Sequence, residues 1–206
     1  MKGEGKSLLL ANLAVSLVLG GKKVVVVDAD LRRPRQHEIF GVDAKAGLST
    51  VSTNRTKLTD ALVSVEVRPP DNAGGGRDAL AWGRDAGARS RLYLLPSGPI
   101  PPNPGEIVAS PRFAAVIEEL KKEADIVLVD TPAMLVAGDT SVIAAAVDGL
   151  IFLTDMDEVK KPQLMTAADQ LMRLPTRMLG IVVRTRGAKG SRYYSPYSYR
   201  YSSTKS

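Results

Sequence analysis

The chain has 206 residues, of which 44% are hydrophobic and 24% charged, proportions that suit a single globular domain with a sizeable core. It has no cysteine and one histidine, His37, which excludes disulfides, cysteine metal sites and sites built on several histidines. The net charge is +6, but the six basic residues from Arg184 onward have no acidic counterpart, which leaves 22 of the 28 basic residues to balance the 22 acidic ones. The body is therefore neutral and the excess belongs to a tail, which argues against a general nucleic-acid-binding surface.

The chain opens with a glycine-rich turn and an apolar run at residues 8–19, for which we predict a helix over residues 7–19. A basic start before an apolar run is also how a signal peptide begins. Asn12 and Ser16 interrupt the run and no small-residue cleavage site follows, so the helix is favoured. At twelve residues the run is too short to span a bilayer.

Beyond this helix, apolar runs alternate with helix-length patterns. The runs lack polar alternation, which is typical of strands covered on both faces, and they lie at residues 24–27, 92–95, 126–129, 150–153 and 181–183. The later helical patterns lie at residues 111–123, 140–146 and 160–174. We therefore predict an α/β fold, a doubly wound and mostly parallel sheet with helices on both faces.

Two segments stand outside this alternation. Residues 68–91 contain Pro69-Pro70 and three consecutive glycines, which predicts a mobile surface loop. Residues 187–206 are rich in Gly, Ser, Arg and Tyr and have one aliphatic residue, Ala188, so they cannot build a core. We predict a domain over residues 1–186 and a disordered, tyrosine-rich tail over residues 187–206.

The glycine-rich turn predicts a phosphate-binding loop. Its glycines let backbone N–H groups face phosphate oxygens, Lys6 would reach the β- and γ-phosphates, and Ser7 would offer its hydroxyl to Mg²⁺. The following helix adds the partial positive charge of its amino end. The predicted nucleotide-binding residues of this loop are Gly3, Glu4, Gly5, Lys6, Ser7 and Leu8.

Two predicted strands end in aspartate. Residues 24–27 run into Asp28-Ala29-Asp30, and residues 126–129 run into Asp130-Thr131-Pro132. Ligands of an open α/β sheet bind beyond the carboxyl ends of its strands, so both clusters should share an edge with the glycine-rich loop. A carboxylate there can hold Mg²⁺ directly or through water. The alternative for each aspartate is a cap of a helix or turn.

These motifs together resemble the bacterial tyrosine kinases of capsule and exopolysaccharide synthesis, which are P-loop ATPases of the deviant-Walker class. The resemblance rests on Gly3–Ser7, on residues 24–30 with Leu31-Arg32-Arg33-Pro34 behind them, and on Asp130-Thr131-Pro132. Pro101-Pro102-Asn103-Pro104 is similar to a segment of that family which partition ATPases generally lack. The resemblance covers nearly the whole chain.

The resemblance implies an enzyme, a protein-tyrosine autokinase that uses ATP and Mg²⁺. Lys6 and Ser7 then belong to the Walker A motif, and Asp28, Asp30 and Asp130 complete the catalytic set. Ser7, Asp30 and Asp130 would serve Mg²⁺, whereas Asp28 would accept the tyrosine proton. The family also implies trans phosphorylation within a ring-like homo-oligomer, and a membrane adaptor, separate or fused upstream, that keeps the domain at the cytoplasmic face of the plasma membrane. No specific nucleic acid is expected as a partner.

The tail supplies the candidate phosphate acceptors. Five of the six tyrosines lie within nine residues, at Tyr193, Tyr194, Tyr197, Tyr199 and Tyr201. A basic, aromatic tail can also bind RNA or a membrane surface. Next to a predicted ATP site, the tyrosines favour autophosphorylation.

The chain also departs from the family pattern. The first glycine of a complete phosphate loop would fall before Met1, and the strand that normally precedes the loop is absent, so we expect a fragment or a misassigned start. Arg184 stands where the family commonly has an asparagine that reads adenine. An arginine cannot accept a hydrogen bond from the adenine amino group, but it can stack on the base.

Two other functions remain open at this point. A partition- or septum-type ATPase, in which ATP switches dimerisation without kinase activity, would share the fold and all three aspartates. Its signature lysine would fall at position 1, which is methionine. A catalytically inactive remnant that only binds the membrane partner is the other alternative.

Overall fold

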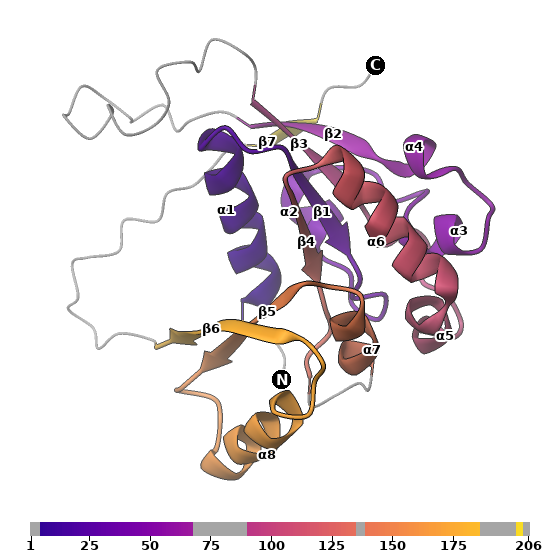
Figure 1. Cartoon of the computed structure of the whole chain (residues 1–206). Helices are drawn as coiled ribbons and strands as arrows, with labels where there is room; N and C mark the ends of the chain where they lie inside the picture. Colours follow the sequence, from indigo (N-terminus) through magenta and orange to yellow (C-terminus); the bar gives the residue numbers. More distant parts are fainter. Residues whose placement is uncertain (1–4, 68–89, 135–138, 186–200, 204–206) are drawn as a thin grey trace, which may run out of the picture.

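The computed structural model describes residues 5–67, 90–134, 139–185 and 201–203, drawn in colour in Figure 1. Its elements in chain order are α1 Lys6–Leu19, β1 Val24–Asp28, α2 Gln36–Phe40, α3 Leu48–Ser52, α4 Leu58–Ala61, β2 Val63–Val67, β3 Ser90–Leu95, α5 Pro104–Ala109, α6 Pro111–Glu123, β4 Ile126–Asp130, α7 Asp139–Ala145, β5 Gly149–Asp155, α8 Lys161–Leu171, β6 Arg177–Arg184 and β7 Tyr201–Ser203. All five strands and all four helices expected from the sequence are confirmed, with end shifts of a few residues.

The strands form two separate sheets. The larger has the order β4-β1-β3-β2-β7, in which β1 is parallel to both β3 and β4, while β2 and β7 are antiparallel. The smaller contains β5 and β6, which are parallel. The mostly parallel α/β fold is thus confirmed, but β4 and β5 belong to different sheets.

The core lies on both faces of β1. Val24 and Val26 face a cluster that includes Ala11, Ala14 and Val15 of α1. The alternate residues of β1 face the other cluster, which α6 covers with Phe113, Val116, Ile117 and Leu120. Figure 1 shows α1 and α6 on opposite sides of the strands. Because successive side chains of a strand point to opposite faces, an all-valine strand suits a position between two helical layers.

Helix α6 begins and ends as its sequence dictates. The Ser110 hydroxyl accepts a hydrogen bond from the N–H of Phe113 at 3.2 Å, and Pro111 occupies the first helical position, where a missing N–H costs nothing. Lys121 and Lys122 lie in the last turn, where positive charge is favourable. This helix fixes one face of the sheet whose strand ends carry Asp28 and Asp130.

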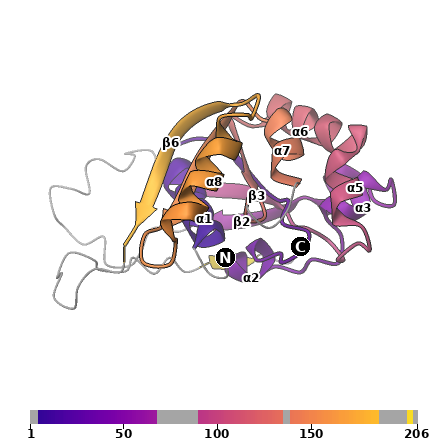
Figure 2. The ribbon, with the colours of Figure 1, turned by 90° about the horizontal axis from the view of Figure 1, so that it is seen from below.

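The pair β5–β6 and helix α8 form a part of their own. Figure 2 shows β6 and α8 at the end of the molecule away from α3 and α5. Every residue of β6 except Gly180 is exposed, and in α8 the buried residue is Ala167. No helix in the described ranges is long and apolar enough to cross a membrane.

Two predicted boundaries differ from the structure. Residues 68–89 lie outside the described residues, but Ser90 and Arg91, expected in the loop, begin β3 and pair with β2. The tail 187–206 was expected to be disordered throughout; within it the structure describes Tyr201–Ser203, which pair with β2 as β7. The free edge of β2 explains this pairing, because it offers unpaired backbone groups to any extended segment.

Candidate active site

The amino end of α1 forms the described part of the glycine-rich loop. Gly5 is the N-cap and has φ +81°, a left-handed conformation that side chains rarely tolerate. A Cβ on Gly5 would also lie 3.1 Å from Nη1 of Arg184. The cap makes no side-chain hydrogen bond and the first turn has no acidic residue. The N–H groups at this helix end, including those of Lys6, Ser7 and Leu8, therefore suit an anion.

The carboxyl ends of β1 and β4 bring two acids together beside this helix end. Asp28 and Asp130 are direct neighbours in the parallel register. Gln36, the first residue of α2, connects them: its backbone N–H donates to Oδ2 of Asp28 at 2.9 Å and its Nε2 donates to Oδ2 of Asp130 at 2.7 Å. The same Nε2 donates to the backbone oxygen of Ser7 at 3.0 Å. The predicted convergence of the loop with Asp28 and Asp130 is what the structure shows.

Both acids are buried, and burial alters their titration. It raises the pKa of Asp28 to about 7, with the negative charge of Asp130 as the next cause; hydrogen bonds from the backbone of Gln36 and Arg35 oppose the shift, and the charge of Asp30 adds to it. Burial also raises the pKa of Asp130, against hydrogen bonds from Ser7 and Gln36 and the charge of Lys6. Oδ1 of Asp28 is buried and accepts no hydrogen bond from the described residues.

Asp30 lies at the same edge but has a different environment. Its Oδ1 accepts the backbone N–H groups of Arg32, at 3.3 Å, and Arg33, at 3.0 Å. Asp30 therefore caps the turn after β1, the alternative considered for each aspartate, and Oδ2 of Asp28 similarly caps the start of α2. Asp30 is partly exposed, whereas Asp28 is fully covered. Capping leaves other oxygens of both acids for a cation.

Arg184 ends β6 and reaches the loop from the smaller sheet. Its Nε lies 3.8 Å from Oδ2 of Asp155, the last residue of β5. Asp155 and Gln36 are site residues that the sequence analysis missed. Asp155 ends an apolar strand as Asp28 and Asp130 do, so the same pattern was available to find it. A single glutamine after a turn carries no comparable pattern.

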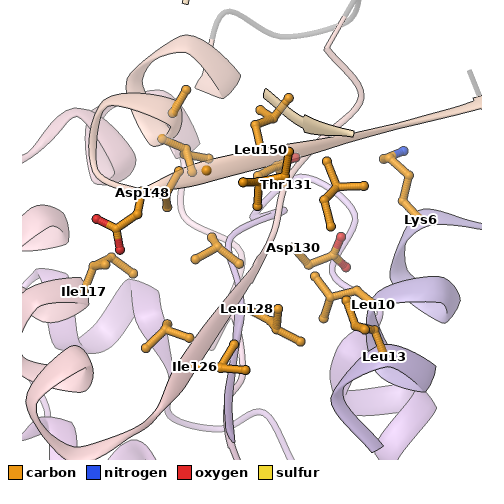
Figure 3. Close-up of a pocket in the computed structure, with 18 of the residues that line it drawn as sticks. Lys6, Leu10, Leu13, Ile117, Ile126, Leu128, Asp130, Thr131, Asp148 and Leu150 are labelled. Atoms are coloured by element: carbon orange, nitrogen blue, oxygen red, sulfur yellow. The ribbon is translucent and has the colours of Figure 1, made fainter. Parts of the chain in front are cut away.

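A cavity of about 450 Å³ begins at Lys6 and Asp130 and extends between the two sheets. Figure 3 shows Asp148 on one side of it and Leu128 and Leu150 in its middle; Lys6 and Asp130 lie on the other side, with Leu10 and Leu13 close to them. The middle of this cavity is apolar, so only its Lys6 end belongs to the candidate site.

The remaining predicted residues are placed as follows. Gly3 and Glu4 of the loop, and Tyr193, Tyr194, Tyr197 and Tyr199 of the tail, lie outside the described residues. Tyr201 begins β7, where its backbone pairs with Val67. Within the described ranges no three His, Cys, Asp or Glu side chains gather closely enough to hold a metal by themselves.

These residues fit a magnesium–nucleotide better than a free metal ion. Mg²⁺ usually takes one or two carboxylates together with phosphate oxygens, so it does not need three protein acids. Two neighbouring buried acids, one with an orphaned oxygen, lie beside a lysine and an uncapped helix end. A cation bound there would offset the negative charges of Asp28 and Asp130 and of the nucleotide phosphates.

Two similar proteins are named as tyrosine-protein kinases, which use the kind of nucleotide that this site fits. The chain is 31% identical over 197 residues to tyrosine-protein kinase YwqD of Bacillus subtilis, a match that covers 96% of this chain and 73% of that protein. It is 31% identical over 195 residues to CapB of Staphylococcus aureus, also named as a tyrosine-protein kinase, with 94% and 76% covered. No protein-family model matches the chain.

Solved structures give the same fold. The chimerical protein CapA2B2 has a TM-score of 0.74 at 27% identity, with 91% of this chain and 73% of that chain covered. The septum site-determining protein MinD of Pyrococcus horikoshii, solved with Mg-ADP, has a TM-score of 0.63 at 24% identity, with 89% and 66% covered, which shows the fold alone. On the strength of YwqD and CapB, the chain belongs to the bacterial tyrosine-protein kinases of capsule and exopolysaccharide systems.

Proposed function

We propose that this chain is the catalytic domain of a protein-tyrosine autokinase that transfers the γ-phosphate of ATP to tyrosines of its own C-terminal segment and thereby regulates capsule or exopolysaccharide synthesis. One observation carries the proposal: Ser7, Asp28 and Asp130 converge on Gln36 at the edge of the sheet that Lys6 also faces. Binding nucleotide phosphates needs the helix end and the lysine. Activating a hydroxyl needs the buried acid.

In this mechanism the amino end of α1 and Lys6 bind and orient the β- and γ-phosphates. Ser7, Asp30 and Asp130 would hold Mg²⁺, which when bound offsets charge on the phosphates during transfer. Asp28 accepts the proton of the tyrosine hydroxyl while the tyrosine oxygen forms its bond to the γ-phosphorus and the bond to the β-γ bridging oxygen breaks, which leaves ADP.

Asp28 suits the role of base because its pKa, raised to about 7, lies near the working pH. A tyrosine hydroxyl has an ordinary pKa of about 10 and attacks poorly while it keeps its proton. Asp28 has no solvent-exposed surface in the structure. A tyrosine hydroxyl can therefore contact its carboxylate only after the residues around Asp28 move apart.

The acceptors are Tyr193, Tyr194, Tyr197, Tyr199 and Tyr201. The resemblance of the sequence to the family supports transfer in trans, with the tail of one copy entering the site of the next in a ring-like assembly. It also supports a membrane adaptor as the partner that holds this domain at the cytoplasmic face of the membrane.

The test is autophosphorylation of the full 206-residue chain with Mg-ATP, read by mass spectrometry of tail peptides. The parent should acquire phosphate on the tail tyrosines, and Lys6→Met should lower the rate at least ~100-fold, since one charge-stabilising donor at a reacting centre is worth ~10²–10³ in rate. Lys22→Met is the matched control, because Lys22 is exposed just beyond the other end of α1. If ATP is hydrolysed but no phosphate appears on the tail tyrosines, the kinase proposal is wrong and the partition-type ATPase is the better interpretation.

A further inference from the structure

The last residues of β5 and β6 lie side by side next to the phosphate loop. Asp155 and Arg184 are partners in the parallel register. The N–H of Met156 donates to the backbone oxygen of Arg184 at 2.9 Å, which ties the two strand ends together. Both side chains therefore lie at the carboxyl ends of β5 and β6, and that of Arg184 lies beside Gly5.

The Asp155 carboxylate is almost completely buried, with 1% of its side chain exposed. A tight turn fixes its direction: Oδ1 accepts the N–H of Asp157 at 3.0 Å, and the backbone oxygen accepts those of Glu158 and Val159. Oδ2 is buried and accepts no hydrogen bond from the described residues. A buried carboxylate oxygen without a donor needs a positive charge nearby, and Nε of Arg184 at 3.8 Å supplies it.

The other end of the Arg184 side chain touches the loop. Nη1 lies 3.1 Å from the position that a Cβ on Gly5 would occupy, so the guanidinium lies close against the loop backbone there. The side chain is still 45% exposed. An arginine that is paired at Nε and stops against a backbone has lost most of its rotamer freedom before any ligand arrives.

The position of Arg184 relative to the acids indicates which part of a nucleotide it would meet. Asp28 and Asp130, the proposed base and Mg²⁺ ligand, come from the larger sheet, whereas Arg184 comes from the smaller sheet and meets the loop at Gly5. A nucleotide with its γ-phosphate beside the acids extends its nucleoside toward the smaller sheet. A guanidinium compensated by a buried carboxylate attracts phosphate less, but it keeps a flat face for stacking.

We propose that Asp155 is a positioning residue of the nucleotide site: it holds the Arg184 guanidinium beside Gly5, where the guanidinium stacks on the base of the bound nucleotide. This inference rests on the proposed function, because it assigns a role within the same ATP site. It gives the smaller sheet a task in nucleotide selection that the acids of the larger sheet cannot perform.

The experiment compares two ligands in a double-mutant cycle. Asp155→Asn keeps the shape of the side chain and the oxygen that accepts the N–H of Asp157, but removes the charge. Calorimetry would give dissociation constants for Mg-ATP and for Mg-tripolyphosphate, which has no base. We expect Asp155→Asn and Arg184→Ala each to weaken the binding of Mg-ATP about tenfold. In the Arg184→Ala background, Asp155→Asn should weaken binding no further, because the effects of two contacting residues that act through one another are not additive.

Tripolyphosphate should bind all these variants within about twofold of the parent, since the affinity of the phosphates depends on the loop and on Lys6. Asp169→Asn removes the same charge from an exposed position of α8 and should leave both affinities unchanged. Equal weakening of both ligands, or additive effects of the two substitutions, would overturn the positioning role and make Asp155 a purely structural residue.

A measurement without nucleotide separates this inference from the proposed function. In the parent, exchange of the Arg184 Nε–H with water, followed by ¹⁵N NMR, should be slowed relative to exposed arginines, and Asp155→Asn should restore fast exchange. Fast exchange in the parent overturns the positioning by Asp155 even if the kinase is active. A parent that binds neither ligand overturns the ATP site and the base contact together, whatever the NMR result.

Discussion

Strands β1 and β6 both contain apolar runs but differ in packing. Every residue of β1 is buried between α1 on one face and α6 on the other. In β6 every residue except Gly180 is exposed, including Leu179 at 61% and Ile181 at 60%. Hydrophobic sequence alone therefore does not decide burial, because a strand is buried only when neighbours cover its faces and edges.

The difference also divides the candidate site. Asp28 and Asp130, the base and the Mg²⁺ ligand of the proposed mechanism, stand on the well-packed sheet. Asp155 and Arg184 stand on the sparsely packed pair and depend on their own ion pair and on the contact with Gly5. Elements with few buried contacts open locally at low cost, so we expect the β5–β6 side of the site to be the more mobile one.

A pair of core and surface substitutions tests this comparison with the largest expected effect. Leu94 of β3 is fully buried, whereas Leu179 of β6 is 61% exposed. Leu94→Ala should lower the free energy of unfolding by about 2–5 kcal/mol, as truncation of a buried leucine does. Leu179→Ala should cost less than about 0.5 kcal/mol, as expected for an exposed site. Urea denaturation measures both, and equal costs would show that β6 is packed as firmly as β3.

The next prediction concerns the acid buried in the well-packed half. The pKa of Asp28 is raised to about 7, so the folded protein binds a proton there that the unfolded chain releases above its ordinary pKa of about 4. Stability should therefore fall as pH rises from about 4 to about 7. Asp28→Asn removes this loss and keeps an oxygen for the N–H groups of Arg35 and Gln36.

We expect Asp28→Asn to be more stable than the parent by about 2–4 kcal/mol at pH 8, with the difference shrinking toward pH 4, where Asp28 is protonated. Thermal unfolding in EDTA between pH 4 and pH 8 measures it. Asp43→Asn is the control, since that side chain is 79% exposed. Parent and Asp28→Asn curves that stay parallel across this range would contradict the burial effect.

Much of the fold followed from the sequence because long patterns are informative. Strands covered on both faces appear as unbroken apolar runs, and the longer helices α6 and α8 show their period, whereas α1 appears as an apolar run too long for a strand. The strand at Val63–Val67 was missed because strands were predicted from unbroken apolar runs alone, although its alternation of valine with Ser64 and Glu66 is typical of a half-buried strand. The helices α2 to α5 have four to six residues, too few for a period to show.

The site was predictable where it depends on topology. Asp28 and Asp130 could be placed together because the carboxyl ends of parallel strands share an edge. Gln36 could not be predicted, because its bridge from Asp28 to Asp130 depends on how the turn after β1 folds back. The separation of β5 and β6 from β4 was not predicted either, because an apolar run does not tell which other strand lies beside it.

The smallest expected effect comes from closing the gap between the sheets. β4 pairs only with β1, and β5 only with β6, in the part of the chain that the structure describes. Their other edges line the apolar cavity of about 450 Å³, whose Lys6 end lies close to the start of the chain (Figure 3). A five-residue apolar strand added before Met1 should enter this cavity and pair with both edges.

Amide exchange in β5 and β6 should then slow by about tenfold or more, which corresponds to about 1.4 kcal/mol of local stability. Exchange in β1 and β3 should change less, because both strands are already covered. Hydrogen–deuterium exchange with mass spectrometry measures each strand in one experiment. An extension of the same length made of serine and aspartate is the control, since charges cannot enter an apolar cavity unpaired. If both extensions protect β5 and β6 equally, the added chain acts without filling the cavity, and the loose packing of the smaller sheet has another cause.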